Sequence, residues 1–437
     1  MEAERKAPTL PMIQRAAALT CVLLQLSFAA AQTRPCDMPG MSGGMKASSF
    51  VEAVEDHSSS GTSVEPASTP VPMMMSAHDG WMLMLHGEAS INDIQQSGPR
   101  GGDKLFSTNW IMPMAQRDLG SGKLTLRTML SLEPATITER EFPELFQVGE
   151  TAFGKAIVDG QHPHNLFMEI AAIYDWKLAK NALLSFYAAP VGDPAIGPTA
   201  YPHRTSASED PLATLGHHLE DSTHVADDVV TAGLTYKRAR LEASGFHGRE
   251  PGENRWTIGY GAIDSYSGRL TIAPAANWIG QFSAARIVSP EVLSPNDNQL
   301  RMTASIGYNR PLERGNWAST LLWGRTRTLG LPQPFNGYLA ESTLKFADKN
   351  YVWSRIENVD RSTELLEQPA ATEEFLARVQ AYSFGYARDF HVIDHADTGL
   401  GAQVTLYEKP SFLTPEYGAH PVGVVMFVRI RLRGKGM

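Results

Sequence analysis

The sequence predicts an all-β protein, a transmembrane antiparallel β-barrel of about sixteen strands, with fourteen or eighteen as neighbouring counts. Three observations predict it. Apolar and polar residues alternate along many segments, short and long gaps alternate between those segments, and an apolar run follows basic residues near the N-terminus. A membrane barrel has lipid outside and water inside, so alternate residues of each strand must be apolar and polar. Tight periplasmic turns and long extracellular loops produce the alternating gaps.

The N-terminus reads as a cleaved secretory signal. Lys6 and Arg15 precede an apolar run over residues 16–30, and three alanines at 29–31 provide the small residues that signal peptidase needs. We therefore expect residues 1–31 to be removed on export. No later stretch approaches the roughly 20 apolar residues of a membrane-spanning helix.

Residues 32–79 are rich in Met, Ser, Gly and Pro and show neither a strand period nor a helix period. This composition predicts a disordered, mobile periplasmic leader, followed by the barrel over residues 80–437. The leader contains a cluster of soft donors that suits Cu(I), namely Cys36, Met38, Met41 and Met45. The alternative is that these side chains are ordinary filler of a low-complexity segment.

The alternation is clearest in the last strand, over residues 424–432. Its apolar side, facing lipid, carries Val424, Met426, Val428, Ile430 and Leu432. Aromatic residues next to the short gaps would form a periplasmic girdle: Trp176, Tyr236, Trp278, Tyr308, Trp317 and Tyr351. A secreted β-sandwich or propeller predicts neither this clustering nor polar residues on the enclosed face.

The same alternation directs charged side chains of both signs into the lumen. They are Arg127, Glu133, Glu169, Glu242, Arg301, Arg325, Arg327, Arg429 and Arg431. Such a set could create a transverse field, a network of salt bridges, or the contacts of a plug. Because every polar lumen needs such residues, they do not identify a solute.

Two long loops, residues 134–165 and 189–227, are expected to fold over or into the lumen. They carry most of the candidate metal ligands: His162, His164, His217, His218 and His224, with Asp159 and Asp221 as further ligands or orienting groups. Imidazole and carboxylate groups that converge from neighbouring loops suit Cu²⁺, Zn²⁺ or Ni²⁺. The alternative is that they only hydrogen-bond the barrel wall.

Composition also limits the partners. The formal net charge of −9 argues against nucleic acid. The expected partners are outer-membrane lipid, a small solute or metal ion, and the barrel-assembly machinery during insertion. The chain continues through residues 433–437 rather than ending on the aromatic residue that this machinery commonly recognises.

Four segments carry a resemblance to known proteins: Trp110 to Leu119, Gln161 to Phe167, Gly216 to His224, and Gly248 to Pro251. They resemble a family of Gram-negative outer-membrane β-barrel proteins over most of residues 80–433. The resemblance implies the fold and an outer-membrane location, and it supplies no reaction. Separately, the Met-rich leader is similar in composition to that of copper-resistance outer-membrane proteins.

The leading hypothesis is an outer-membrane barrel for selective passage or binding of a small solute, with a transition-metal ion such as copper or zinc as the first candidate. One alternative is a nonspecific porin whose loop histidines are structural. Another is an outer-membrane hydrolase with a His/Asp site at the rim, using His164 with Asp159, or His217 or His218 with Asp221. A non-enzymatic role is favoured, because no nucleophile-elbow motif accompanies these residues.

Overall fold

The computed structural model describes residues 47–221, 226–362, 365 and 376–434. The expected signal over 1–31, the four soft donors Cys36, Met38, Met41 and Met45, and His224 lie outside the described residues. The described helices are short: α2 (Phe50–Glu55), α3 (Glu133–Thr136), η1 (Thr138–Arg140), α4 (His217–Glu220), η4 (Ser411–Leu413) and α5 (Thr414–Tyr417). Among the described residues, no helix combines the length and the apolar character that crossing a membrane demands.

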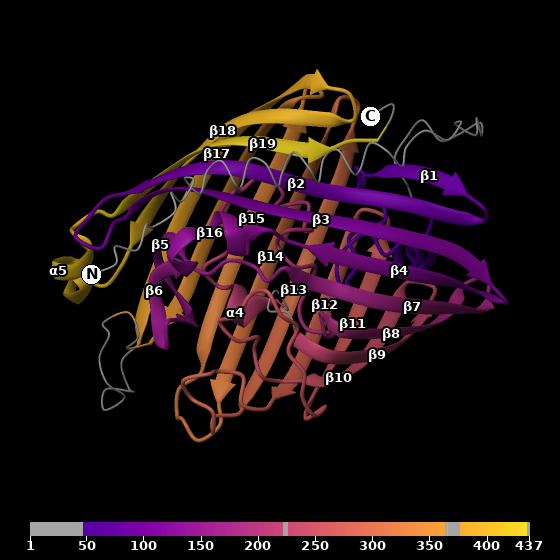
Figure 1. Cartoon of the computed structure of the whole chain (residues 1–437), viewed down its shortest axis with the longest axis horizontal. Coiled ribbons are helices and arrows are strands. Elements are labelled where there is room, and N and C mark those ends of the chain that lie inside the picture. Colours follow the sequence, from indigo (N-terminus) through magenta and orange to yellow (C-terminus); the bar gives the residue numbers. More distant parts are fainter. Residues whose placement is uncertain (1–46, 222–225, 363–364, 366–375, 435–437) are drawn as a thin grey trace, which may run out of the picture. The chain divides into compact units, whose positions relative to one another are not determined.

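Sixteen antiparallel strands close into one barrel, which confirms the predicted fold class and strand count (Figure 1). Closure joins the last strand to the first, with Val428 opposite Ile91. The barrel strands are β2 (Trp81–Gln96), β3 (Asp103–Leu119), β4 (Gly122–Leu130), β7 (Phe167–Ala179), β8 (Ala182–Gly192), β9 (Ala226–Tyr236), β10 (Ala239–His247), β11 (Ser265–Ala275), β12 (Trp278–Ile287), β13 (Gln299–Leu312), β14 (Gly315–Thr328), β15 (Phe335–Phe346), β16 (Asn350–Arg361), β17 (Ala377–Ile393), β18 (Ala396–Glu408) and β19 (Val422–Leu432).

Three further strands lie outside the barrel wall. Strand β1 (Met74–His78) forms a hairpin with the start of β2. Strands β5 (Phe142–Ala152) and β6 (Lys155–Gln161) pair with each other in the loop between β4 and β7. All connections at one end of the barrel are turns of two or three residues, and the long loops lie at the other end. We call these the short-turn end and the long-loop end.

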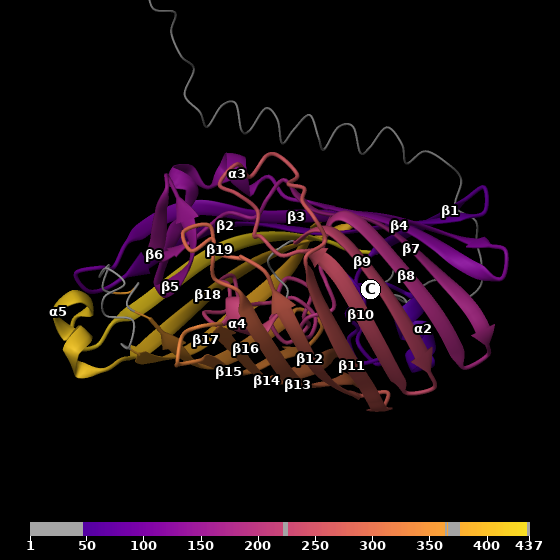
Figure 2. The same cartoon turned by 90° about the horizontal axis from the view of Figure 1, so that it is seen from below.

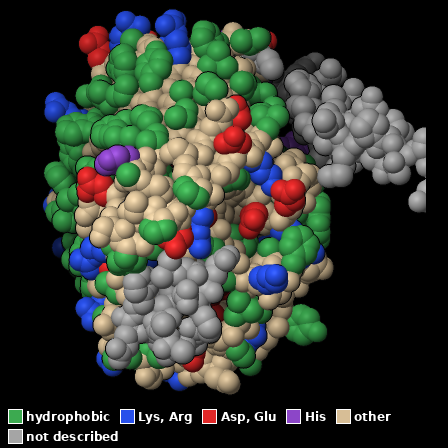
Figure 3. All heavy atoms as spheres, turned by 90° about the vertical axis from the view of Figure 1, so that its left-hand side faces the viewer, with side chains coloured by type: hydrophobic (Ala, Val, Ile, Leu, Met, Phe, Trp, Pro, Cys, Tyr) green, Lys and Arg blue, Asp and Glu red, His purple; other side chains and the backbone are tan. Residues whose placement is uncertain are grey.

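Side-chain exposure follows the predicted alternation. On β19, Met426 is 52% exposed on the outer face, whereas the neighbouring Phe427 is 5% exposed and faces the lumen. Apolar residues therefore cover the outside of the barrel, as a membrane-embedded surface requires. Figure 3 views the side on which α5 lies in Figure 1 and shows hydrophobic side chains along its upper left edge, with charged side chains of both signs elsewhere.

Three side-chain directions were predicted wrongly. Arg325 and Arg327 share the outer face of β14 with Leu321, whereas Leu322 and Thr326 are buried inside. The strand has 14 residues, more than the 9–11 or so that cross the hydrocarbon core, so its last outward residues lie beyond the lipid and can be charged. Tyr351 is buried in the lumen, where its ring lies 5.6 Å from the guanidinium carbon of Arg429, and does not join the outer girdle.

Part of the predicted leader is folded inside the barrel. Residues 47–73, which we call the inner segment, contain α2 and run within the lumen before β1 (Figure 2). Ser49 caps α2 by accepting a hydrogen bond from the Glu52 amide at 3.2 Å. One face of the helix packs against apolar lumen-facing residues, in a cluster of Phe50, Val51, Val54, Leu183, Ala273 and Ile279. The prediction of a mobile leader is therefore wrong for residues 47–73.

The loop after β8, residues 193–221, also enters the lumen, and we call it the inner loop. Its short helix α4 contacts β13, β14 and β15 from inside. Towards the long-loop end, its leucines pack with the β5–β6 hairpin and the loop before β19, in a cluster that includes Leu145, Phe146, Leu215, Leu219, Leu413 and Tyr417. Both long loops thus fold over or into the lumen, as their lengths suggested.

Candidate functional site

A cavity of about 440 Å³ remains in the lumen beside the inner segment and the inner loop. It extends from residues at the short-turn end, such as Asp348 and Asp397, to His162 and His164 on the far side. Its walls come from β2, β3, β13 to β19, the inner segment and the inner loop. The residues that line it include Glu88, Trp110, His203, Lys345 and Arg431.

Arg127 on β4 anchors the inner segment. Its guanidinium donates to the carbonyl oxygens of His57, Ser59 and Gly61 at 2.8, 2.6 and 2.5 Å. The same group forms a two-bond ion pair with Glu169, at 2.7 and 2.8 Å. The carboxylate of Glu169 in turn accepts from the Gly61 amide at 2.9 Å. A fully buried pair with this many bonds fixes the segment against the wall.

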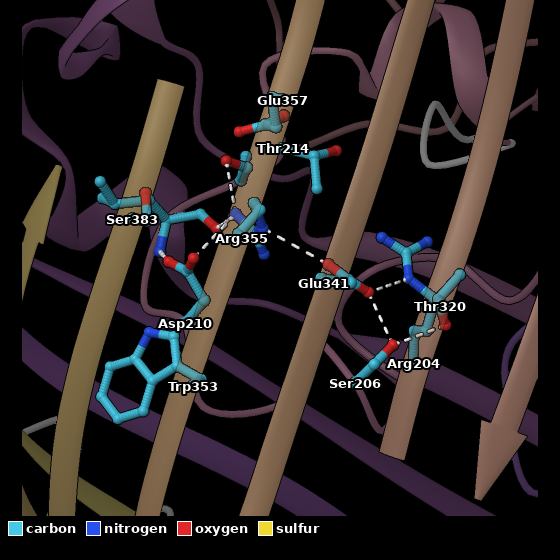
Figure 4. Close-up of polar contacts among 12 residues, drawn as sticks. Arg204, Ser206, Asp210, Thr214, Thr320, Glu341, Trp353, Arg355, Glu357 and Ser383 are labelled. Carbon is cyan, nitrogen blue, oxygen red and sulfur yellow. Dashed lines mark hydrogen bonds and ion pairs between the residues drawn. The ribbon is translucent and has the colours of Figure 1, made fainter. Parts of the chain in front are cut away.

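A second buried network fixes the inner loop to the opposite wall (Figure 4). Glu341 on β15 accepts from Arg204 of the loop at 2.6 Å and from Arg355 on β16 at 3.4 Å. Arg355 also pairs with Asp210 of the loop at 3.1 Å. Ser206 donates to Glu341 at 2.7 Å. Arg355 also donates to the Leu212 carbonyl of the loop at 3.0 Å, and together these buried contacts hold the loop as a partition of the lumen.

Most remaining lumen charges are also paired. Arg429 contacts Glu209 at 2.5 Å and Asp389 at 3.0 Å, and Arg431 contacts Glu88 at 2.6 Å. Glu242 pairs with Arg240 and Arg269, and Arg301 is buried on the lumen side. Glu133 lies in α3 rather than on a wall strand. Of the outcomes the sequence left open, the structure shows an interlocked network that holds a plug.

Three of the predicted metal ligands converge. His162 follows β6, and His217 and His218 begin α4; their ligand nitrogens lie within 4.8 Å of one another. The Nδ1–H of His162 points to the Pro163 carbonyl at 2.9 Å, and that of His217 to the Thr214 carbonyl at 2.7 Å. In a neutral imidazole these contacts place the lone pair on Nε2. Backbone carbonyls orient many metal-binding histidines in this way.

Carboxylates surround this cluster. Glu150 lies 3.5 Å from Nε2 of His162 and is itself held by Arg255 at 2.9 Å. Glu250 lies 4.0 Å from Nδ1 of His218. Burial, followed by repulsion from neighbouring carboxylates, raises the pKa of Glu250 well above its usual range. The sequence did not single out these glutamates, because they come from other loops.

The other predicted ligands lie elsewhere. Asp159 accepts from Tyr417 at 3.0 Å and from the Phe146 amide at 2.7 Å, which gives it a structural role in the long-loop cluster. Asp221 pairs with Arg204 at 3.3 Å. Among the described residues, the group of ligand atoms within 4.8 Å of one another contains the three histidines and neither of these aspartates.

His164 takes part in a different array. Its Nδ1 lies 2.9 Å from Glu133, and Nε2 accepts from the Tyr201 hydroxyl at 3.1 Å. The order hydroxyl, imidazole and carboxylate matches that of a catalytic triad. Burial, however, raises the pKa of Tyr201 well above its usual range, so the hydroxyl stays protonated and serves as a hydrogen-bond donor.

The sequence missed a group of lumen-facing methionines on β2, β3 and β4. Met84 is buried together with Met73, Met112, Met114, Met129 and Met168, and Met82 is partly buried against them. Alternate residues of a strand share one face, and on β2 the polar residues His86, Glu88 and Ser90 mark the lumen face. Because Met82 and Met84 fall in the same alternation, the sequence could have placed them inside.

Comparison with known protein families and with curated proteins finds no match. Among solved structures, the OmpF complex with daunomycin from Salmonella typhi is 9% identical, with a TM-score of 0.51, covering 82% of this chain and 100% of that one. An anion-selective porin from Comamonas acidovorans is 10% identical, with a TM-score of 0.48, covering 80% and 100%. The outer-membrane channel DcaP of Acinetobacter baumannii is 11% identical, with a TM-score of 0.45, covering 81% and 98%. The likeness to OmpF supports the fold: a closed barrel of the kind found in bacterial outer-membrane proteins.

Proposed function

We propose that this chain is an outer-membrane channel that binds and selectively passes a small solute, with a transition-metal ion as the leading candidate. The observation that carries the proposal is the cavity: it runs through the lumen, and its lining includes His162, which lies next to His217 and His218. A solute in this cavity would therefore reach His162, the one member of the three-histidine cluster among the lining residues.

The outer membrane is the location that suits the molecule. Exposed apolar residues cover the outer wall, and the barrel shares its fold with outer-membrane proteins. In this setting the outer wall contacts lipid, and insertion would use the barrel-assembly machinery. We also propose that residues 1–31 are an export signal, which delivery to the outer membrane would require.

The donor set favours a borderline divalent ion. Three imidazoles with an adjacent carboxylate are typical of zinc and copper sites, and two of the imidazoles already present Nε2 through bonds to carbonyls. Copper and zinc are both compatible with these ligands. Glu150, held by Arg255, is placed to orient His162 or to join the ion.

The filled lumen argues against a wide, nonspecific pore. Within the described part of the chain, the inner segment and the inner loop are both fixed to the wall by buried ion pairs, and the cavity beside them measures about 440 Å³. The hydrolase alternative depended on His164, His217 or His218 next to Asp159 or Asp221. In the structure Asp159 bonds Tyr417, Asp221 pairs with Arg204, and His164 contacts Glu133 in place of Asp159, which gives the hydrolase alternative little support.

Calorimetric titration of the refolded mature barrel with Zn²⁺ and with Cu²⁺ tests the metal assignment. The double variant His217→Ala/His218→Ala should bind at least about tenfold more weakly, since two ligands are lost. His247→Ala is the matched control, because this histidine bonds the Ala262 carbonyl and is not part of the three-histidine cluster. Equal affinity in wild type and double variant would refute the assignment.

Conductance in a planar bilayer tests passage. We expect small, stable channels that are blocked as Cu²⁺ is raised from nanomolar to micromolar concentration, and weaker block in the double variant. Large channels indifferent to metal would favour the nonspecific porin. A barrel that is closed at every voltage would refute passage of a solute and leave only binding.

A further inference from the structure

The inner wall of β2, β3 and β4 carries an unusual density of methionine for a barrel lumen. Met84, Met112, Met114 and Met129 are each less than 5% exposed and share one cluster with Met73 of the inner segment. Lumen-facing residues of a barrel are ordinarily polar, so a group of thioethers there requires its own explanation.

The strand register aligns part of this group into a row. His86 on β2 lies directly opposite Met112 on β3. The register of β3 with β4 pairs Ile111 with Leu130 and Met114 with Arg127, which sets Met112 opposite Met129. Since neighbouring strands are about 4.8 Å apart, one imidazole and two thioethers follow each other across three strands on the lumen face.

A second imidazole completes the set from the inner loop. Nε2 of His203 lies 3.3 Å from Sδ of Met129, and the rings of His86 and His203 are 5.8 Å apart. Trp110 packs against both rings, at 4.7 and 4.6 Å. Two histidines and two methionines from four separate elements are thus neighbours on one part of the inner wall.

This part of the wall opens onto the lumen cavity, because His86, Trp110 and His203 all line it. Within the described part of the chain, Nδ1 of His86 and Nδ1 of His203 are buried without a hydrogen-bond partner. Buried nitrogens without partners are costly. An ion held between the two rings would give a partner to one nitrogen of each ring. Methionine used only as a gap filler would not account for these two nitrogens.

We propose that His86, Met112, Met129 and His203 form a binding site for a monovalent soft metal ion, Cu(I). Thioether sulfur and neutral imidazole are the donors that such an ion prefers. All four donors are uncharged, and the nearest charged groups are already paired, Arg127 with Glu169 and Arg431 with Glu88. The site therefore suits one positive charge better than two.

This inference goes beyond the proposed function. It concerns a second site, on the cavity wall, with donors and a preferred ion different from those of the three histidines.

Ag⁺ is the probe, because it is a stable monovalent ion with the same preference for sulfur. The titration uses the full mature chain carrying Cys36→Ser, Met38→Leu, Met41→Leu and Met45→Leu, so that the leader cannot bind the ion. In this background we expect one tight equivalent. Met112→Leu/Met129→Leu should weaken it at least about tenfold, while preserving volume and packing.

The matched control is Met302→Leu/Met426→Leu, which changes two methionines on the outer face and should leave Ag⁺ affinity unchanged. Unweakened binding in Met112→Leu/Met129→Leu would overturn the proposal, as would the absence of any tight equivalent. If the leucine variant loses its fold, His203→Gln serves in its place, with the same expected loss. A triple alanine variant of His162, His217 and His218 should retain Ag⁺ binding, so this site and the proposed function can fail separately.

Discussion

Replacing Arg127 by methionine should release the inner segment from the barrel wall. The guanidinium makes three bonds to backbone carbonyls of that segment and two to Glu169. Methionine retains most of the side-chain volume and removes every one of these donors. It also leaves Glu169 as an unpaired buried carboxylate, since its other donors, the Gly61 amide and Tyr187, carry no full charge.

The expected cost follows from these contacts. Breaking a buried ion pair by removing one partner costs about 3–5 kcal/mol. Each of the three bonds to carbonyls adds to the docking of the segment, but the five bonds share one group and their energies do not add. A cost of this size shifts the docking equilibrium of residues 47–73 by roughly two to four orders of magnitude.

Hydrogen exchange measured by mass spectrometry on the refolded barrel in detergent reports this equilibrium. We expect amides of residues 47–73 to exchange at least about a hundredfold faster, while the barrel strands stay protected. Arg314→Met is the control, because this arginine pairs with Asp348 at an exposed turn and should change nothing. Adding Glu169→Gln to Arg127→Met should recover part of the protection. Exchange within threefold of wild type in Arg127→Met would refute the role of this arginine as an anchor.

Two further predictions concern the same segment. Gly61 has a φ of +60°, and an added Cβ would lie 2.6 Å from Cβ of Asp193, so Gly61→Ala should undock the segment by an amount comparable to Arg127→Met. Gly252→Ala, in open space, is the control, and unchanged hydrogen exchange in Gly61→Ala would contradict the packing described. Asp193 has a pKa raised to about 7, chiefly by burial and then by repulsion from Glu169, although the nearby guanidinium opposes this shift. A raised carboxyl pKa means that the folded state holds the proton more tightly, so stability is greatest below about pH 4 and falls as the pH rises through 7. Thermal unfolding at pH 5 and pH 8 should show this loss, and Asp193→Asn should remove it; an equal pH dependence in that variant would exclude Asp193 as the cause.

The wall of the barrel was predictable from the sequence because lipid imposes one rule on every strand. Apolar residues must point outward at every second position, and residues such as Met426 and Ile306 do so. The rule fails at Arg325 and Arg327, where β14 continues past the lipid and the outer face meets water or headgroups. The alternation of apolar and polar residues along a strand indicates which face of the barrel a side chain is on. It does not indicate how deep in the membrane that side chain lies.

The contents of the lumen were less predictable, because they depend on contacts between distant parts of the chain. The inner segment has few apolar residues since its partners are polar groups of the wall, such as Arg127 and Asn309. Its composition therefore looks like that of a disordered leader. The three histidines could be proposed from residue type, whereas the partners of Asp159 and His164 could not, because the loop paths are set by tertiary contacts.

The position of the inner segment in the chain constrains the order of assembly. It precedes β2, yet it lies inside a barrel that closes only when β19 pairs with β2, and Ser68 bonds Asn309, 241 residues away. The segment must therefore be inside before this seam forms, or thread in afterwards through the short-turn end. By either route, docking of the segment is coupled to the pairing of β19 with β2. This pairing joins the two ends of the barrel sequence, and folding steps that join distant residues are slow. Refolding of the intact chain should lag behind that of a chain starting at β1, even though the shorter chain has fewer contacts to gain.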